Sequence, residues 1–496
     1  MSTETELKFA VDPKRAATIE AALRKHGGVQ RTIRSRYFDT EDGRLAAQRL
    51  SLRLRKADGA WEQTLKAPGP STVERAEDTV ARPGKWGTAG PEVHPELHVG
   101  ASSGKALRAA LGDPGDSRAT LSPVHESSIK RLAAEVTVDD TRVEIAFDRG
   151  ALHAGLKSAA VCEVEYELKA GDPAVWVALA RADVARFGLV LSTVSKAARA
   201  ERLARGVESG PAVTFDTPKI SIHADGAALF RRVAAACLEQ IMGNAAEIAE
   251  NGADDEQVHQ LRIGIRRLRT AARELAGLAS TSDRSWEAPL TAAFRALGRY
   301  RDRRTVAPTI EARLEAAGSP SPSIGGAASD GPDPVEIVRD PAFQVAMLDV
   351  LALTLAPQKE SMPVPRASDA KRIVVDRLRR LRRRLRRDAE RFETLDEEGQ
   401  HRVRKRLKRL RYLTELVALL FGRRRTQAYL AHLKPAQDVV GSHVDLLLAR
   451  RAASTASKTD DPKAWFNVGW LGAEIGHSAR RARKALARAG RAPGFW

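Results

Sequence analysis

Charged side chains stand at every second position in several segments of the first half of the chain. These alternating sets are Glu4, Glu6 and Lys8, then Arg53 and Arg55, then Glu163, Glu165 and Glu167. Alternate residues of a β-strand point to the same face, so each set would form one charged face. Lys66, Arg75 and Glu77 follow in other segments, and Glu144 and Asp148 could share a face.

If these faces point into an enclosed space, carboxylates and basic groups would line it together. Carboxylate oxygens are ligands for hard cations such as Mg²⁺ and Mn²⁺, which also bridge phosphate oxygens. Arg and Lys would neutralise the remaining phosphate charge, and a second metal could activate a water. The alternative is a set of outward faces with cross-strand ion pairs. Four strands with matched signs favour the inward interpretation.

The same segments predict a barrel of antiparallel strands. Period-two alternation runs through Glu4–Phe9, Ser51–Arg55, Thr141–Phe147 and Val161–Leu168, and short helices are expected at Pro13–His26 and Pro173–Phe187. Along each barrel strand, interior and exterior residues alternate, which would place the charged set inside. From about Asp225 onward the chain is rich in Ala and Arg with an apolar residue every three or four positions, a pattern typical of helices.

Basic charge is concentrated in this helical half. The 496 residues carry a net charge of +19, and residues 1–207 hold 32 basic and 28 acidic side chains against 50 and 35 in the remainder. Lys371–Arg387 alone holds ten basic residues and one acidic residue, Asp376. Like charges at i and i+4 destabilise a helix, so such a surface suggests an anionic partner.

A repeat in the helical half places basic residues at the same spacing twice. The two sets are His259, Arg262, Arg266 and Arg269, and His401, Arg404, Lys408 and Arg411, both at offsets 0, 3, 7 and 10. Each set falls within an arc of about 80° on a helix, beside an apolar stripe. A solvated charged surface is the plainer interpretation. The repetition favours two stripes that face one another and bind phosphate.

Composition excludes several classes of protein. Two cysteines cannot form a disulfide framework or a cysteine zinc site. No apolar run approaches the ~18–20 residues that span a bilayer, and the N-terminus lacks an apolar secretory core. We therefore expect a cytoplasmic protein with no membrane partner. The Arg-rich helices have no interleaved aromatic residues for base stacking, which disfavours a nucleic-acid partner.

The sequence predicts an α+β protein of two domains. Residues 1–207 would form a domain of strands with flanking helices, and 208–222 a linker. Residues 223–496 would form an all-α pseudo-repeat of two helical sub-bundles, with a low-complexity break near 317–334.

The first domain resembles the CYTH superfamily, the triphosphate tunnel metalloenzymes, over about residues 2–205. The matching motifs are Glu4-x-Glu6-x-Lys8, Tyr37-Phe38-Asp39-Thr40, Leu50–Arg55, Glu62-x-Thr64-Leu65-Lys66, Arg75-x-Glu77, Glu144-x-x-x-Asp148-Arg149-Gly150, Glu163-x-Glu165-x-Glu167 and Ser195-Lys196. The resemblance implies that residues 1–207 form an eight-stranded antiparallel tunnel with flanking helices. It implies that Glu4, Glu6, Glu163 and Glu165 hold metal, as Mg²⁺ or Mn²⁺. It implies phosphate binding by Lys8, Arg53, Arg55, Lys66, Arg75, Lys130, Arg131 and Lys196. Glu77, Glu144 and Glu167 would serve a second metal or orient water.

The helical half resembles the CHAD domain, on Val258–Arg269 and His401–Tyr412, with Arg301-Asp302 and Gln437-Asp438-x-x-Gly441 similar to its later motifs. This resemblance implies polyphosphate binding by the two basic stripes. A chain with both domains is similar to bacterial inorganic triphosphatases, which implies metal-dependent hydrolysis of triphosphate. The alternatives are a non-catalytic polyphosphate-binding protein associated with polyphosphate granules, and an enzyme acting on another triphosphate, such as thiamine triphosphate or ATP in a cyclisation.

Overall fold

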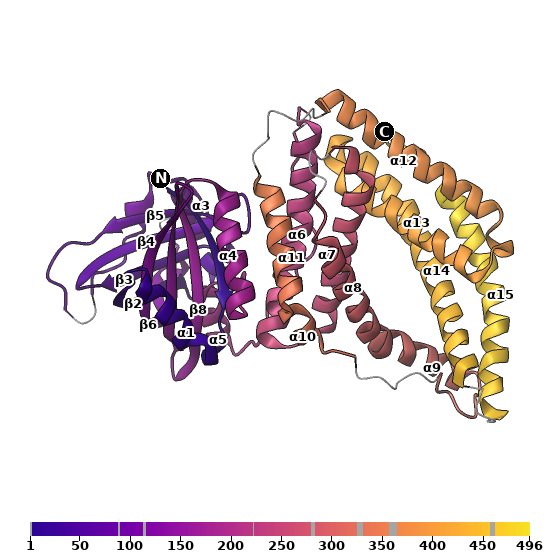
Figure 1. The fold of residues 1–496 in the computed structure, drawn as a ribbon, viewed down its shortest axis with the longest axis horizontal. Coiled ribbons are helices and arrows are strands. Elements are labelled where there is room, and N and C mark those ends of the chain that lie inside the picture. The colour runs from indigo at the N-terminus through magenta and orange to yellow at the C-terminus, as the bar shows by residue number, and fades with distance from the viewer. Residues whose placement is uncertain are drawn as a thin grey trace. The chain divides into compact units, whose positions relative to one another are not determined.

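A computed structural model describes residues 2–87, 90–112, 116–221, 223–278, 283–324, 331–356, 365–456 and 462–496. The chain divides into two compact units (Figure 1). Unit 1 contains Met1–Val213, Met242–Gln257 and Val338–Ala356, and unit 2 contains Thr214–Ile241, Val258–Ile337 and Pro357–Trp496. No described helix is both long and apolar enough to cross a bilayer.

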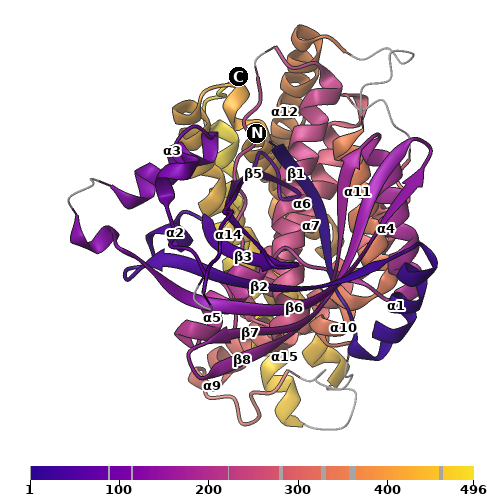
Figure 2. The ribbon, with the colours of Figure 1, turned by 90° about the vertical axis from the view of Figure 1, so that its left-hand side faces the viewer.

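Unit 1 is built on a closed antiparallel barrel, as the sequence predicts. Its strands are β1 (Ser2–Ala10), β2 (Val29–Thr40), β3 (Ser51–Ala57), β4 (Ala60–Pro68), β5 (Glu74–Ala81), β6 (Leu121–Val138), β7 (Thr141–Ala154) and β8 (Lys157–Ala170). They follow the order β5-β4-β3-β2-β6-β7-β8-β1, and pairing of β1 with β5 closes the barrel (Figure 2). The short β9 (Val190–Leu191) pairs with Phe9 and Ala10 of β1, on the edge opposite β8.

The barrel has its apolar residues on the outside and its charged residues within. In β1, Leu7 and Phe9 are buried against the exterior packing, and Phe9 meets the ring of Tyr166 edge-on at 5.6 Å. The alternate residues Glu4, Glu6 and Lys8 line the interior. Apolar residues on the outside of the barrel are stable there only because helices cover this outer face. Burial of an exterior Leu or Phe contributes about 1.5–3 kcal/mol.

Five helices of residues 1–207 surround the barrel: α1 (Ala16–Lys25), α2 (Arg44–Ala47), α3 (Ser102–Leu111), α4 (Pro173–Phe187) and α5 (Lys196–Arg205). Helix α4 begins where Asp172 caps the amide of Ala174 and ends at Gly188, whose φ of +66° suits glycine. The Ser195 hydroxyl caps α5, so Lys196 is the first residue of that helix. The expected helix over 13–26 is a 3₁₀ turn at Pro13–Arg15 followed by α1.

Two later segments complete unit 1. Helix α11 (Pro341–Leu355) packs on α4, and its Gln344 accepts a hydrogen bond from the Leu191 amide at 2.9 Å. In the C-terminal part of α6 (Gly226–Asn251), Glu247 forms a bidentate pair with Arg202 at 2.6 and 2.9 Å and accepts from the Gly210 amide at 3.0 Å. The beginning of the expected linker therefore lies against α6.

Unit 2 is helical, as expected. Besides the start of α6 it contains α7 (Asp255–Glu274), α8 (Glu287–Arg301), α9 (Ala307–Ala316), α10 (Pro334–Arg339), α12 (Ala367–Glu390), α13 (Glu397–Leu416), α14 (Arg423–Ala456) and α15 (Pro462–Arg491). The first residues of α7 and the end of α10 are assigned to unit 1. A π-helical turn, Asp302–Val306, joins α8 to α9. Of the expected break at 317–334, residues 325–330 lie outside the described residues, whereas Ile324 is buried in a core of α9, α14 and α15.

Candidate functional site

The barrel encloses a cavity of about 360 Å³ that receives side chains from all eight strands and from α5. The predicted residues that line it are Glu4, Glu6, Lys8, Arg53, Arg55, Lys66, Arg75, Glu77, Arg131, Glu144, Glu165, Glu167 and Lys196. Strand pairing explains this convergence, because Glu6 pairs with Glu167 and Glu167 with Glu144 around the wall.

Two predicted residues do not line the cavity. Lys130 is exposed, because it precedes Arg131 in β6 and alternation turns it to the outer face. Glu163 is 2% exposed and pairs with Arg199 and Lys196, which separate it from the cavity. The expected substrate contact of Lys130 is therefore not supported by its position.

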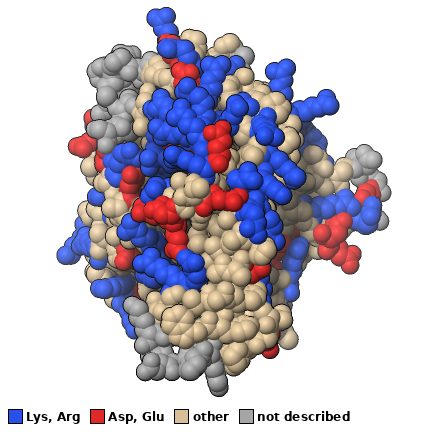
Figure 3. Space-filling model, turned by 90° about the vertical axis from the view of Figure 1, so that its right-hand side faces the viewer, with Lys and Arg blue, Asp and Glu red and all other residues tan. Residues whose placement is uncertain are grey.

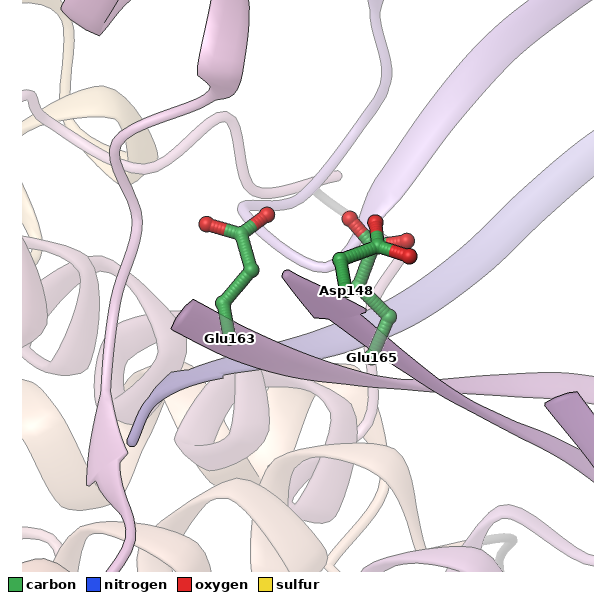
Figure 4. Close-up of side chains that lie close together, drawn as sticks. All are labelled: Asp148, Glu163 and Glu165. Carbon is green, nitrogen blue, oxygen red and sulfur yellow. The ribbon is translucent and has the colours of Figure 1, made fainter. Parts of the chain in front are cut away.

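A cluster of three carboxylates stands at one side of the tunnel. Asp148 on β7 is paired with Glu163 on β8, and Glu165 lies two residues further along β8 (Figure 4). One oxygen or more from each lies within 4.8 Å of the others. The Lys196 ammonium contacts all three, at 2.7 Å from Asp148 and 2.8 Å from Glu165. Sequence reasoning did not select Asp148 as a site residue, although its spacing from Glu144 was a usable signal.

A second group of carboxylates surrounds Lys66. Its ammonium pairs with Glu4 and lies 2.9 Å from Glu77. Burial, together with the charges of Glu6 and Glu77 and against the effect of Lys66, raises the pKa of Glu4 to about 7. Burial acts in the same direction on Glu77, but Lys66 and Arg53 outweigh it and lower its pKa to about 2. The structure thus places Glu4 with Glu77 and Lys66, and not in the cluster of Asp148, Glu163 and Glu165.

Basic residues occupy the remaining wall. Burial and the neighbouring charges of Arg53 and Arg131 lower the pKa of Arg55 to about 10. Tyr37 also lines the cavity and stacks on His125 with centroids 4.7 Å apart. Burial would raise the pKa of Tyr37, yet Arg53, Arg55 and Lys196 lower it overall. The tyrosine was visible in the sequence only as part of a motif, without a chemical role.

Most charges of the tunnel are compensated by neighbours of opposite sign. The Arg131 guanidinium donates two hydrogen bonds to Asp148, both 2.7 Å long, and a further one to Glu165. Burial lowers the pKa of Lys196, but Asp148, Glu163 and Glu165 raise it above its usual value overall. Conversely, Lys196 and Arg131 hold the pKa of Glu165 well below its usual range in spite of burial.

The residues present fit a divalent cation. Asp148, Glu163 and Glu165 provide only oxygen donors, which Mg²⁺ and Mn²⁺ prefer. They already converge on a positive charge, the ammonium of Lys196. No histidine or cysteine belongs to this group among the described residues, so softer metals are disfavoured.

The two basic stripes of unit 2 converge at four cations: Arg262, Arg266, Arg404 and Lys408, here called the basic cluster. Burial is the largest cause that lowers the Lys408 pKa, to about 5, and the charges of Arg266 and Arg404 act in the same direction. Burial, followed by Arg266, lowers the pKa of Arg262 to about 10. The stripes therefore lie close enough to repel one another, as the repeat predicted.

The repeat extends beyond the predicted residues. Gly298 and Asp302 close α8, and Gly441 and Asp445 stand at the same spacing in α14. A Cβ on Gly298 would lie 3.1 Å from Arg262 Nη2, and one on Gly441 3.7 Å from Arg404 Nη2. Arg404 donates to Asp445 at 3.1 Å. Each copy thus holds an arginine over a glycine, beside a carboxylate one helical turn later.

The other stripe residues differ between the copies. Arg269 lies over the ring of Phe294, 5.8 Å from its centroid, whereas Arg411 pairs with Glu415 at 2.7 Å and donates to Gln437. Burial and the cations Lys405, Arg404 and Lys408 lower the pKa of His401. His259, its counterpart, is half-buried. The ion pair of Arg411 leaves it less available to an anion than Lys408.

A closed tunnel of charged side chains followed by a helical repeat with basic stripes defines a fused two-domain class. Family models match this order: the CYTH domain over residues 2–200 and the CHAD domain over residues 232–454. The chain therefore carries a CYTH domain followed by a CHAD domain, which confirms the resemblance and the predicted fold.

Individual relatives match parts of the chain. An inorganic triphosphatase from Haemophilus influenzae is 27% identical over 176 residues, which are 35% of this chain and 47% of that protein, so the match spans about half of the relative. The crystal structure of the CHAD domain from the plant Ricinus communis is 23% identical, with a TM-score of 0.43 over 57% of this chain and 99% of that one. A protein from Pyrococcus horikoshii is 17% identical, with a TM-score of 0.26 over 40% and 97%.

Proposed function

We propose that unit 1 hydrolyses a phosphoanhydride bond of inorganic triphosphate with the aid of a divalent metal. The observation that carries this proposal is the cavity of about 360 Å³, in which carboxylates and guanidinium groups face the same enclosed space. An anion of several linked phosphates needs both groups, since cations neutralise its oxygens and carboxylates retain the metal. The CYTH match and the triphosphatase relative support the same class of substrate.

Each part of the wall has a role in this proposal. Lys8, Arg53, Arg55 and Arg75 would bind phosphate oxygens and hold the chain in line for attack by water on the terminal phosphorus. Asp148, Glu163 and Glu165 would hold a divalent cation, which neutralises phosphate charge and polarises the bond that breaks.

Hydrolysis also requires groups that act on the attacking water, and Glu144, Glu167 and Glu77 are further carboxylates of the cavity. Water forms a new bond to phosphorus, the anhydride oxygen leaves with pyrophosphate, and one proton of the water must be accepted. Glu144 and Glu167, near Lys169 at 3.9 and 2.7 Å, would orient that water, and one of these two carboxylates would accept its proton. Glu77, with its pKa of about 2, stays ionised at neutral pH and suits the retention of cations such as Lys66.

Unit 2 would bind inorganic polyphosphate at the basic cluster. Four partly buried cations face one another there, and a bound phosphate chain would supply the missing negative charge. The CHAD match supports this part of the proposal.

The first test measures phosphate release from inorganic triphosphate with Mg²⁺ or Mn²⁺, for the wild type, Glu165→Gln and Glu6→Gln. Loss of the Glu165 carboxylate should reduce turnover on the order of 10²-fold or more. Glu126→Gln is the matched control, because Glu126 pairs with Arg36 away from the cavity lining.

The outcomes separate the alternatives. Turnover that needs metal and falls in Glu165→Gln, but not in Glu126→Gln, would support hydrolysis in the tunnel. Absence of turnover with inorganic triphosphate, ATP and thiamine triphosphate would overturn the enzyme proposal and favour a polyphosphate-binding protein.

A further inference from the structure

Helix α12 carries a row of arginines on the side opposite its core. Its buried residues include Val374, Leu378, Leu381 and Leu385. Arg372, Arg379, Arg383 and Arg386 are exposed. At 100° per residue these four lie within an arc of about 60°, centred about 140° from the apolar stripe. From Arg372 to Arg386 the row is about 21 Å long.

Helix α15 carries a second row of the same kind. Arg480, Lys484, Arg488 and Arg491 are exposed and fall within an arc of about 80°, opposite buried Leu486. No acidic residue follows Glu474 in the sequence, so nothing on this part of the helix opposes these charges.

Helices α12 and α15 pack antiparallel, and the two rows meet end to end near Arg386 and Gly490. Arg386 of α12 packs on Gly490 of α15, where a Cβ would lie 2.9 Å from its Cγ. Seven residues later in the chain, Glu393 accepts a hydrogen bond from Arg483 Nε at 2.7 Å. We call the exposed cations of these two rows the exterior arginine face. Figure 3 shows Lys and Arg prevailing over Asp and Glu on much of the side that carries α12 and α15 in Figure 1.

This face is separate from the basic cluster. On α13, Arg406 is two residues from Arg404 and therefore about 200° around the helix from it. Arg406 pairs with Asp388 of α12, so α13 lies between α12 and the basic cluster. Moreover, α15 begins beyond residue 454, where the CHAD match ends. The α15 row thus lies outside the CHAD match, whereas the α12 row lies within it.

The exposed residues define the chemistry of a partner. Every fully exposed residue between 371 and 390, and between 480 and 491, is charged. An anionic membrane would favour exposed apolar anchors on the helix, and a single strand would favour aromatic rings for stacking. Arginine forms bidentate hydrogen bonds with phosphate. A partner that presents only phosphates, along a rigid backbone, fits best.

We propose that the exterior arginine face binds duplex nucleic acid through its phosphate backbone, without sequence preference. The absence of stacking residues, which disfavours single strands, places no limit on a duplex, whose bases are already stacked within it. The two rows in succession form an extended strip of cations, which suits the backbone of a rigid duplex. A row of about 21 Å matches about six base pairs at about 3.4 Å each. In the basic cluster the Arg404 side chain is 18% exposed, so this site suits an anion thinner than a duplex.

The test uses the full-length protein and a short duplex DNA of mixed sequence, with binding measured against salt concentration. In one variant Arg383, Arg386, Lys484 and Arg488 are replaced by Glu. Loss of four phosphate contacts should weaken binding at least tenfold and lower the slope of log K against log salt by about 3–4. A matched variant reverses four exposed cations of unit 1, Arg15, Arg24, Arg34 and Lys105, with the same change in net charge.

Triphosphate turnover and polyphosphate binding are measured on the same variants, so that this proposal and the proposed function can fail independently. The proposal is supported if the α12–α15 variant alone loses duplex binding and retains both other activities. It is overturned if the wild type does not bind the duplex, if both variants lose affinity equally, or if the α12–α15 variant loses polyphosphate and not DNA. Replacement of the same four residues by Gln checks that the result does not depend on misfolding.

Discussion

The tunnel and the basic cluster both collect basic side chains, but they treat the charge in opposite ways. In the tunnel, Lys66 and Lys196 sit among carboxylates that raise their pKa values in spite of burial. In the basic cluster, burial and neighbouring cations lower the pKa values of Lys408 and Arg404, and Asp445 offsets this only in part. The tunnel supplies carboxylate counter-ions for its cations, whereas the basic cluster has too few of them.

The difference indicates what each site needs from a ligand. An anion entering the tunnel displaces internal ion pairs and leaves carboxylates without partners, so a further cation must arrive with it. An anion at the basic cluster supplies negative charge that the protein itself does not provide, so no further cation has to bind with it. Metal dependence should therefore belong to the tunnel alone.

The largest expected effect comes from removal of metal. A chelator should lower triphosphate turnover on the order of 10²-fold or more, because no cation would then replace Lys196 among Asp148, Glu163 and Glu165. Polyphosphate binding by the same sample should remain within a factor of two, as followed by calorimetry. Loss of both activities on chelation would contradict the contrast between the two sites.

The next effect is a pair of stability changes with opposite signs. Lys196→Met leaves three carboxylates without their common partner and should lower the free energy of unfolding by about 3 kcal/mol. Lys408→Met removes an amine that gives up its proton at pH 7 when it is buried among cations, and should raise the free energy of unfolding by about 1 kcal/mol or more. Chemical denaturation at pH 7 measures both. Changes of the same sign would show that the two sites are not electrostatic opposites.

Polyphosphate binding should also depend on pH. Lys408, with a pKa of about 5, is neutral at pH 7 in the free protein. A phosphate chain favours the charged form and raises this pKa, so the complex takes up a proton. Affinity should then rise as pH falls toward 5, by up to about tenfold per unit. Calorimetry in buffers of different ionisation enthalpy measures the proton uptake, and Lys408→Met should abolish it. Unchanged uptake in that variant would assign the proton to another group.

The smallest effect tests the symmetry of the repeat. Gly298→Ala places a methyl group 3.1 Å from Arg262 Nη2 and should displace that guanidinium, weakening polyphosphate binding a few-fold. Gly441→Ala, at 3.7 Å from Arg404 Nη2, should leave binding unchanged. Both changes should preserve stability, since alanine is favoured over glycine in a helix by about 1 kcal/mol. Equal losses would mean that contact with the arginine does not set the effect.

Much of the fold and of the candidate site is predictable from the sequence because both rest on short periods. Alternation in β1 and β8 carries the charged residues to one face, and thirteen of the fifteen predicted tunnel residues line the cavity. In each basic stripe, the offsets of 3, 7 and 10 residues likewise place the four basic residues on one face of a helix. Each of these patterns lies within one segment of the sequence and can be recognised without knowing which segments pack beside it.

What local patterns do not predict is the partner across a strand pair. Glu163 has the same alternation as Glu165, yet Arg199 and Lys196 cover it. Asp148 joins the carboxylates only because β7 pairs with β8 in one register. Lys130 stands beside Arg131 in the sequence, and only the register of β6 decides which of the two faces inward. The sequence does not reveal that Gly298 and Gly441 correspond. Each glycine lies beside an arginine of another helix, and nothing in its own segment indicates that contact.

The packing of α11 against α4 has a consequence for how the protein is made. The barrel strands leave the ribosome long before residue 356, the last residue of unit 1. At about 5–20 residues per second, roughly 7 to 30 seconds separate the synthesis of residue 207 from that of residue 356. During that interval the apolar side of α4 has no α11 to cover it. A nascent chain would therefore rely on chaperones longest at this helix, and a truncation after residue 207 would retain that exposure permanently.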